Sequence, residues 1–278
     1  MQEKIAIDLE GVPKTLLLPL LGRAQLSQKS YSPIRDPRAV ELVEALDFDF
    51  DELLVQVGES SPLWWVARAY HFDHAIKDFL RYYPKATIVN LGAGLDTMFY
   101  RVDNGKLTWV DLDLPEVMAL RTTLLPPPPR VHYLATSALD TSWFAEVKRW
   151  GNPVFFVAGG LIFYFTEDQA KQLLLQLAEN FPRAELIFDT SSKKGMSYAN
   201  NMLENANMAE ARLQWGMDDP KILTTWSEKI QLLSSIPWFK RIKVKYRFPV
   251  LQRFKMFMCD FSYKHAIVHI RFARNLEH

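Results

Sequence analysis

The sequence predicts a doubly wound α/β protein, in which seven mostly parallel strands carry helices on both faces of the sheet. Short apolar runs alternate with helical stretches about five times after residue 84, and the runs cover residues 86–91, 107–111, 131–134, 154–158 and 184–189. Residues 1–84 show helical patterns only. A polar, helix-prone insertion at about 191–237 precedes two late strands, expected as an antiparallel pair at 240–248 and 266–272.

Local signals support the individual elements. The run 86–91 is apolar without clean alternation, which is typical of a strand buried on both faces. Asp36 and Pro37 predict a helix start, and a longer helix is expected over about 62–81. Thr166 caps the clearest helix of the core, 167–180. Four prolines at 126–129 predict a stiff connector between two units.

The chain is thus expected to have an N-terminal helical cap at 1–84 and a core at 85–275 that contains the insertion. Residues 276–278 resemble the start of a vector-encoded histidine tag, and we assign them no function. The N-terminus lacks the layout of a secretory signal. No apolar run reaches the roughly 18 to 20 residues that span a bilayer.

Composition excludes several classes of function. With 33 basic and 32 acidic residues among 278, the net charge is +1, so no footprint for nucleic acid or an anionic membrane is expected. The densest basic stretch, 240–245, alternates with apolar residues and predicts one solvated face of a strand. The single cysteine, Cys259, excludes an internal disulfide and favours a cytoplasmic location. Its apolar neighbours predict a buried structural thiol.

The most informative segment is the glycine turn Gly92-Ala93-Gly94, which follows a predicted buried strand. Glycines permit a sharp turn and a close approach of a ligand to the backbone. Position 97 is Thr97 and lacks the third glycine of the dinucleotide fingerprint, so a phosphate-free cofactor such as S-adenosylmethionine fits better. Asp111 and Asp113 end the next strand, where a carboxylate can bind ribose hydroxyls. Alternatively, these aspartates cap the helix expected near residue 115.

Several segments together resemble the leucine carboxyl methyltransferase family, particularly its bacterial branch of polyketide-type (tetracenomycin-like) O-methyltransferases. The resemblance covers nearly the whole chain and is carried by residues 12–24, 36–39, 91–97 with Arg101, 111–117 and 160–165. It implies a Rossmann-like class I methyltransferase fold and S-adenosylmethionine as methyl donor, with S-adenosylhomocysteine as product.

The resemblance also implies roles for individual residues. The cofactor-binding residues implied are Arg23, Arg68, Gly92, Ala93, Gly94, Asp111, Asp113, Ser137, Ala138 and Gly159. Arg23 and Arg68 would lie near the methionine carboxylate, which arginine can bind through two parallel hydrogen bonds. Ser137 and Ala138 would flank the adenine. Relatives commonly carry Glu in place of Gly159, and this departure affects a contact beside the cofactor.

The implied reaction is an in-line methyl transfer to an oxygen of a small acceptor. A carboxylate acceptor is ionised at neutral pH and needs no general base, and no metal site is expected. Tyr164 either orients the acceptor or belongs to the core. Met and Trp residues of the insertion could line an apolar pocket.

Two other functions remain open: a methyltransferase of protein C-terminal carboxylates and a non-catalytic S-adenosylmethionine-binding protein. An NAD-dependent oxidoreductase is a third, less favoured alternative.

Overall fold

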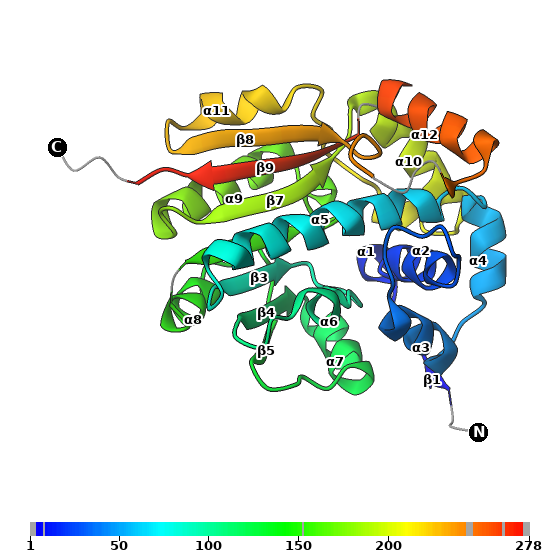
Figure 1. Cartoon of the computed structure of the whole chain (residues 1–278), viewed down its shortest axis with the longest axis horizontal. Coiled ribbons are helices and arrows are strands. Elements are labelled where there is room, and N and C mark those ends of the chain that lie inside the picture. Colours follow the sequence, from blue (N-terminus) through cyan, green and yellow to red (C-terminus); the bar gives the residue numbers. More distant parts are fainter. Residues whose placement is uncertain (1–3, 8, 152, 243–246, 263–264, 275–278) are drawn as a thin grey trace.

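A computed structural model describes residues 4–7, 9–151, 153–242, 247–262 and 265–274. Its central sheet has seven strands in the order β5-β4-β3-β6-β7-β9-β8 (Figure 1). The strands are β3 (Thr87–Leu91), β4 (Thr108–Asp113), β5 (Val131–Ala135), β6 (Val154–Ala158), β7 (Glu185–Thr190), β8 (Ile230–Pro237) and β9 (Ala266–Phe272). β3 to β7 are parallel to one another, whereas β9 runs antiparallel to both β7 and β8. The predicted seven-stranded α/β sheet is confirmed.

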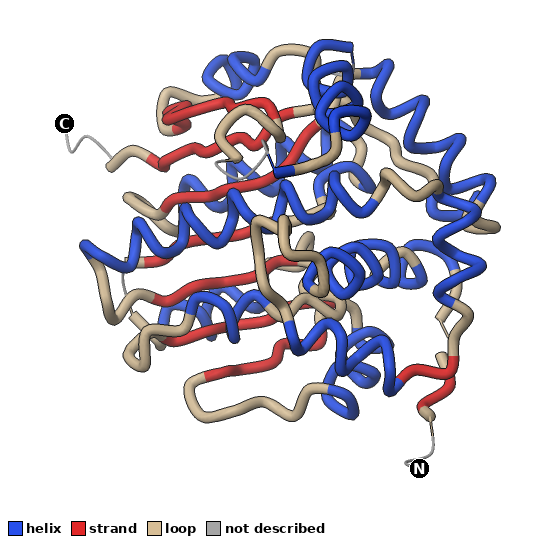
Figure 2. The backbone as a smooth tube through the Cα atoms, turned by 45° about the vertical axis from the view of Figure 1, so that its right-hand side comes forward, coloured by secondary structure: helices blue, strands red, loops and turns tan. Residues whose placement is uncertain are grey.

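Helices cover both faces of this sheet, as Figure 2 shows in a turned view. The helices beside the sheet are α5 (Pro62–Tyr82), α6 (Met98–Val102), α7 (Pro115–Leu124), α8 (Trp143–Arg149) and α9 (Glu167–Asn180). Ile88 and Phe155 belong to the same buried cluster as the apolar side of α5. Their neighbours Val89 and Phe156 belong to a second cluster with α8 and α9. Successive strand residues point to opposite faces, so each strand fills two cores and is apolar throughout.

The N-terminal region is helical, as expected. It contains α1 (Gly11–Lys14), α2 (Leu17–Ser27), α3 (Pro37–Ala45) and α4 (Phe50–Val57) before α5. Asp36 caps α3 by accepting a hydrogen bond from the amide of Ala39 at 3.1 Å. Two strands of two residues each, β1 (Ile5–Ala6) and β2 (Leu46–Asp47), pair with one another and were not predicted. A pair this short leaves no periodic pattern in a sequence.

The region between β7 and β9 differs from the prediction in two ways. It contains α10 (Lys193–Asn205), the single turns η2 (Ala209–Ala211) and η3 (Pro220–Ile222), α11 (Leu223–Trp226), β8 and α12 (Val250–Ser262). The late strand expected at 240–248 is wrong: β8 ends at Pro237, residues 243–246 lie outside the described part, and α12 was missed. The expected insertion 191–237 therefore includes β8. The centre of β8 carries two adjacent polar residues, Ser234 and Ser235, and its pairing with β9 is irregular between Leu232 and Ser234, so this edge strand resembles the polar insertion before it.

The chain order of the strands defines where a ligand can bind. From β3 the chain continues to β4 and β5 on one side, and then crosses back to β6 and β7 on the other. The carboxyl ends of β3 and β6 therefore flank the topological switch point, where open parallel sheets bind ligands. No helix in the described ranges is long and apolar enough to cross a membrane.

Candidate active site

The glycine turn leaves the carboxyl end of β3 with left-handed backbone at Gly92 (φ +67°) and Gly94 (φ +48°). The amides of Gly92 and Ala93 both donate to the carbonyl of Leu112 at 2.8 and 3.1 Å, which fixes the turn against β4. A Cβ at position 92 would lie 2.9 Å from Leu161 Cδ1. Glycine is therefore required by both the backbone conformation and the space.

Asp113, at the end of β4, lies beside this turn and lines the cavity. Its Oδ2 accepts the amide of Gly94 at 2.7 Å, and its Oδ1 accepts the amide of Leu114 at 2.7 Å. Burial raises the pKa of Asp113, against the lowering effect of both amides. Ser137 and Ala138, which follow β5, line the same end of the cavity. A carboxylate oxygen can accept more than one hydrogen bond, so Asp113 retains acceptor capacity toward hydroxyl groups.

Asp111 does not line the cavity. Its side chain is fully buried, and Oδ1 accepts hydrogen bonds from Asn90 Nδ2 at 2.9 Å and Trp109 Nε1 at 2.8 Å. Its Oδ2 pairs with Arg121 Nη2 at 2.6 Å. Three donors therefore engage this carboxylate inside the sheet, and its geometry gives it a structural role in place of the ribose contact expected for it.

Arg23 lines the cavity from α2 but is held by the protein itself. Its Nε pairs with Asp36 at 3.1 Å, Nη2 donates to the carbonyl of Leu95 at 2.9 Å, and Nη1 lies 3.7 Å from Asp96. Burial raises the pKa of Asp96, yet the charges of Arg23 and Arg101 hold it below the usual value. Asp96 is thus an ionised carboxylate on the cavity wall, and the sequence prediction missed it. Its position directly after the glycine turn was the available signal.

Arg68 and Gly160 share one carboxylate at the end of β7. Asp189 is fully buried; its Oδ2 pairs with Arg68 Nη1 at 3.0 Å, and its Oδ1 accepts the amide of Gly160 at 2.6 Å. A Cβ at Gly159 would lie 2.8 Å from a ring carbon of Phe72, so the space beside this glycine is already filled. Asp189 was predicted only as a strand residue. Its contacts now assign it to the support of the cavity wall.

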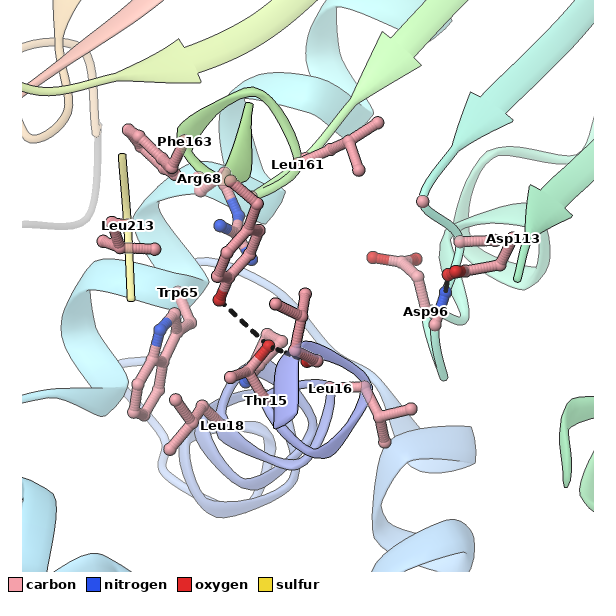
Figure 3. Close-up of a pocket in the computed structure, with 18 of the residues that line it drawn as sticks. Thr15, Leu16, Leu18, Trp65, Arg68, Asp96, Asp113, Leu161, Phe163 and Leu213 are labelled. Atoms are coloured by element: carbon pink, nitrogen blue, oxygen red, sulfur yellow. Dashed lines mark hydrogen bonds between the residues drawn. The ribbon is translucent and has the colours of Figure 1, made fainter. Parts of the chain in front are cut away.

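These groups surround one cavity of about 390 Å³, which extends from the glycine turn toward the N-terminal helices and the insertion. Figure 3 shows Asp96 and Asp113 at one end, and Phe163 and Leu213 at the other. The distal wall is apolar and aromatic, with Trp64, Trp65, Phe72, Phe163, Met196, Met202, Leu213 and Trp238. Met196 and Met202 come from α10, so methionines of the insertion line this cavity, whereas its tryptophans Trp215 and Trp226 pack against each other and do not line it.

Tyr164 lines the cavity from the turn η1 (Ile162–Tyr164). Its hydroxyl donates to Thr15 Oγ1 at 3.0 Å, and Thr15 in turn donates to the carbonyl of Val12 at 2.7 Å. Burial raises the pKa of Tyr164, so the phenol is neutral at pH 7. Within the described ranges, no group of three His, Cys, Asp or Glu side chains could hold a metal ion.

Comparison with known proteins identifies the family. Residues 17–178 match the model of the leucine carboxyl methyltransferase family, which covers more than half of the chain. The chain belongs to this family. Its members are S-adenosylmethionine-dependent methyltransferases, so the family and the cofactor predicted from the sequence are confirmed.

Individual relatives agree with this assignment. The chain is 28% identical over 218 residues to the tetracenomycin polyketide synthesis O-methyltransferase TcmP of Streptomyces glaucescens, covering 78% of this chain and 79% of that one. It is 26% identical over 242 residues to the S-adenosyl-L-methionine-dependent methyltransferase dpfgK of Gibberella zeae, covering 80% and 81%. A solved structure from Thermobifida fusca, provisionally assigned as a methyltransferase, shares the fold with a TM-score of 0.56 at 14% identity, covering 92% and 95%.

Proposed function

We propose that this methyltransferase transfers a methyl group to a carboxyl oxygen of a small, largely apolar acid. The observation that carries the proposal is the continuity of the cavity. Its polar end lies at the glycine turn and Asp113, and its apolar, aromatic end is formed by the N-terminal helices and the insertion. A donor and an apolar acceptor can therefore be enclosed together, and proximity is the main requirement when the methyl group is already activated.

The polar end suits S-adenosylmethionine in the chemistry of its lining residues. Asp113 would accept the ribose hydroxyls, Ser137 and Ala138 would flank the adenine, and the turn at Gly92, Ala93 and Gly94 would allow close approach of the backbone. The ionised Asp96 complements the positive charges of the donor. Arg23 would act by holding Leu95 and Asp96 in place, because its three nitrogens already contact protein groups. This role refines its expected contact with the methionine carboxylate.

Arg68 is the cation at the junction of the two ends. One nitrogen pairs with Asp189, and the guanidinium faces the backbone at Gly159 and Gly160. The remaining N–H groups can bind a carboxylate, either that of the methionine moiety or that of the acceptor. Tyr164 would contribute its phenol to acceptor orientation, which requires release of its hydrogen bond to Thr15.

The chemistry needs few groups of the protein. S-adenosylmethionine supplies a sulfonium-activated methyl group; the acceptor oxygen forms the new O–CH3 bond while the S–CH3 bond breaks and its electron pair remains on sulfur. A carboxylate acceptor carries no proton at neutral pH, so the chain has to align it and exclude water, and no base is required.

The test is a methyl-transfer assay with labelled S-adenosylmethionine. Aromatic carboxylic acids, matched phenols and peptides with free C-terminal carboxylates would be compared as acceptors. We expect label on the aromatic acids, released as methanol by mild alkali because a methyl ester hydrolyses readily. Alkali-stable label on the phenols would contradict carboxyl transfer, and label on the peptides would identify a protein C-terminal methyltransferase. Tight donor binding by calorimetry without turnover on any acceptor would indicate a non-catalytic protein.

A further inference from the structure

The stretch of sequence that contains α12 has a composition unlike the rest of the chain. Residues 238–262 contain seven of the 33 basic residues but one of the 32 acidic ones, so the remainder has 26 basic and 31 acidic residues. This segment therefore carries +6, while the rest of the chain carries −5. The overall charge of +1 conceals this separation.

One side of α12 packs on the protein, and the other presents apolar side chains to solvent. Met256 and Cys259 are buried in the core, and burial raises the pKa of the Cys259 thiol to about 12. The outward side chains are 39% to 77% exposed: Val250, Leu251, Phe254, Phe257, Met258 and Phe261. At about 100° per residue these six positions fall within an arc of about 120° that faces away from Met256 and Cys259. No charged residue interrupts this arc.

Cations border the apolar arc on both sides. Arg253 and Lys255 are exposed and lie on opposite flanks of it, and Lys255 Nζ donates to Ser60 Oγ at 2.7 Å. Lys240, Arg241 and Arg247 are exposed in the segment leading to the helix. An apolar face with basic borders is the arrangement of helices that lie in the plane of a membrane interface, where the cations reach the lipid headgroups.

The same helix adjoins the acceptor end of the cavity. Trp238 is the first residue of the segment 238–262, and His265 follows the segment. Both line the cavity, and their rings stack with centroids 4.7 Å apart. Figure 1 shows α12 at the edge of the molecule, above α10 in that view. A surface bound by α12 would therefore lie beside the part of the cavity that receives an apolar acceptor.

We propose that α12 docks this methyltransferase on an anionic lipid surface, with the Phe254, Phe257 and Phe261 side chains inserted at the interface. Charge favours lipid over a second copy of the chain, because two copies joined through this face would bring two segments of +6 together. An exposed apolar patch of this extent marks an interaction site. The proposal does not depend on the identity of the acceptor or on methyl transfer.

Cosedimentation of the full chain with lipid vesicles tests this inference without donor or acceptor present. Vesicles of phosphatidylcholine alone would be compared with vesicles of phosphatidylcholine and phosphatidylglycerol in equal parts. We expect the protein to sediment with the anionic vesicles only, and binding to weaken as salt is added. Failure to bind anionic vesicles at low salt would overturn the proposal.

Matched variants distinguish vesicle binding through α12 from nonspecific binding through other exposed apolar side chains. Phe257→Ser with Phe261→Ser should lower the vesicle partition coefficient about tenfold or more, since both rings would leave the interface. Tyr82→Ser with Ile222→Ser, at exposed apolar positions on other elements, should leave it unchanged. Lys240→Glu with Arg253→Glu should abolish the preference for anionic lipid. Equal binding by the two apolar double variants would contradict the assignment of α12.

Sedimentation velocity tests the alternative that a second copy of this chain covers the apolar face of α12. A wild-type dimer that the Phe257→Ser, Phe261→Ser variant converts to monomer, together with no vesicle binding, would assign the face to self-association and overturn the proposal. Thermal unfolding midpoints near the wild-type value are expected for all variants because the altered side chains are exposed.

Discussion

The carboxylate of Asp113 accepts a hydrogen bond from the backbone amide of Gly94 at 2.7 Å. This contact joins the acidic end of β4 to the glycine turn after β3, two features that lie 19 positions apart in the chain. The acid that we propose to bind ribose therefore also holds the glycine turn in place, so a substitution of Asp113 would affect both.

Asp113→Asn should weaken S-adenosylhomocysteine binding by about ten- to a hundredfold. The substitution removes the charge and points an amide N–H group at one of two backbone donors, and a hydrogen bond to a charged group contributes about 1.5–3 kcal/mol. Isothermal titration calorimetry would measure the change. Asp47→Asn, at an exposed position, is the control. Unchanged binding in Asp113→Asn would exclude Asp113 from the cofactor site.

Gly92→Ala and Gly105→Ala should separate backbone strain from crowding. Both glycines have positive φ, at +67° and +75°, so each alanine costs about 1–2 kcal/mol of stability. A Cβ at Gly105 meets nothing within 4 Å, whereas at Gly92 it meets Leu161 on the cavity wall. We expect both variants to be less stable in urea unfolding and only Gly92→Ala to bind the cofactor more weakly. Equal binding by both would place the ligand away from the turn.

Asp111→Ala should lower the free energy of unfolding by about 3–5 kcal/mol, because it leaves the buried Arg121 without its ion-pair partner. Urea denaturation measures this loss. Binding by the folded fraction should be nearly unchanged, since Asp111 does not line the cavity. A stable variant with lost binding would restore the ribose role expected from the sequence.

Asp189→Asn and Arg68→Lys should each reduce kcat/KM for the acceptor, and the double variant should be little worse than either single one. The reason is that both changes disrupt the same 3.0 Å pair, and residues acting through one contact are not additive. Steady-state rates with a fixed excess of donor give the three values. Full additivity would show that Asp189 does not act through Arg68.

Acid should destabilise the protein partly through His265. Burial lowers the pKa of His265 from 6.5 to about 4, so the folded state favours the neutral ring. Above pH 6.5 the ring is neutral in both the folded and the unfolded state. As the pH falls from 6.5 toward 4, only the unfolded state takes up the proton, which lowers the free energy of unfolding by up to about 3 kcal/mol. Urea unfolding at pH 7 and pH 4.5 should therefore show a smaller drop for His265→Phe than for the wild type. Equal drops would indicate that the imidazole titrates normally.

Local interactions account for what could be predicted from the sequence. The five parallel strands, the helix starts at Pro37 and Pro62, and the turn at Gly92 each depend on residues close together in the chain, so periodicity, caps and glycines locate them. β8 was missed because this edge strand carries two adjacent polar residues, Ser234 and Ser235, and lacks the apolar run of the buried strands. The apolar residues of α12 do recur with helical spacing, but only the structure shows that this side of the helix faces solvent.

The sequence by itself determined the fold class, the position of the glycine turn, the family and the methyl donor, because these follow from short motifs. Only the tertiary structure decided which acids serve the cavity. Asp111 and Asp113 are two residues apart on one strand, yet the first pairs with Arg121 inside the sheet and the second lies at its edge. Asp189 became part of the site because β7 places it against Arg68 from α5, a partner 121 residues away. Such pairings depend on packing between distant segments, and no local motif encodes them.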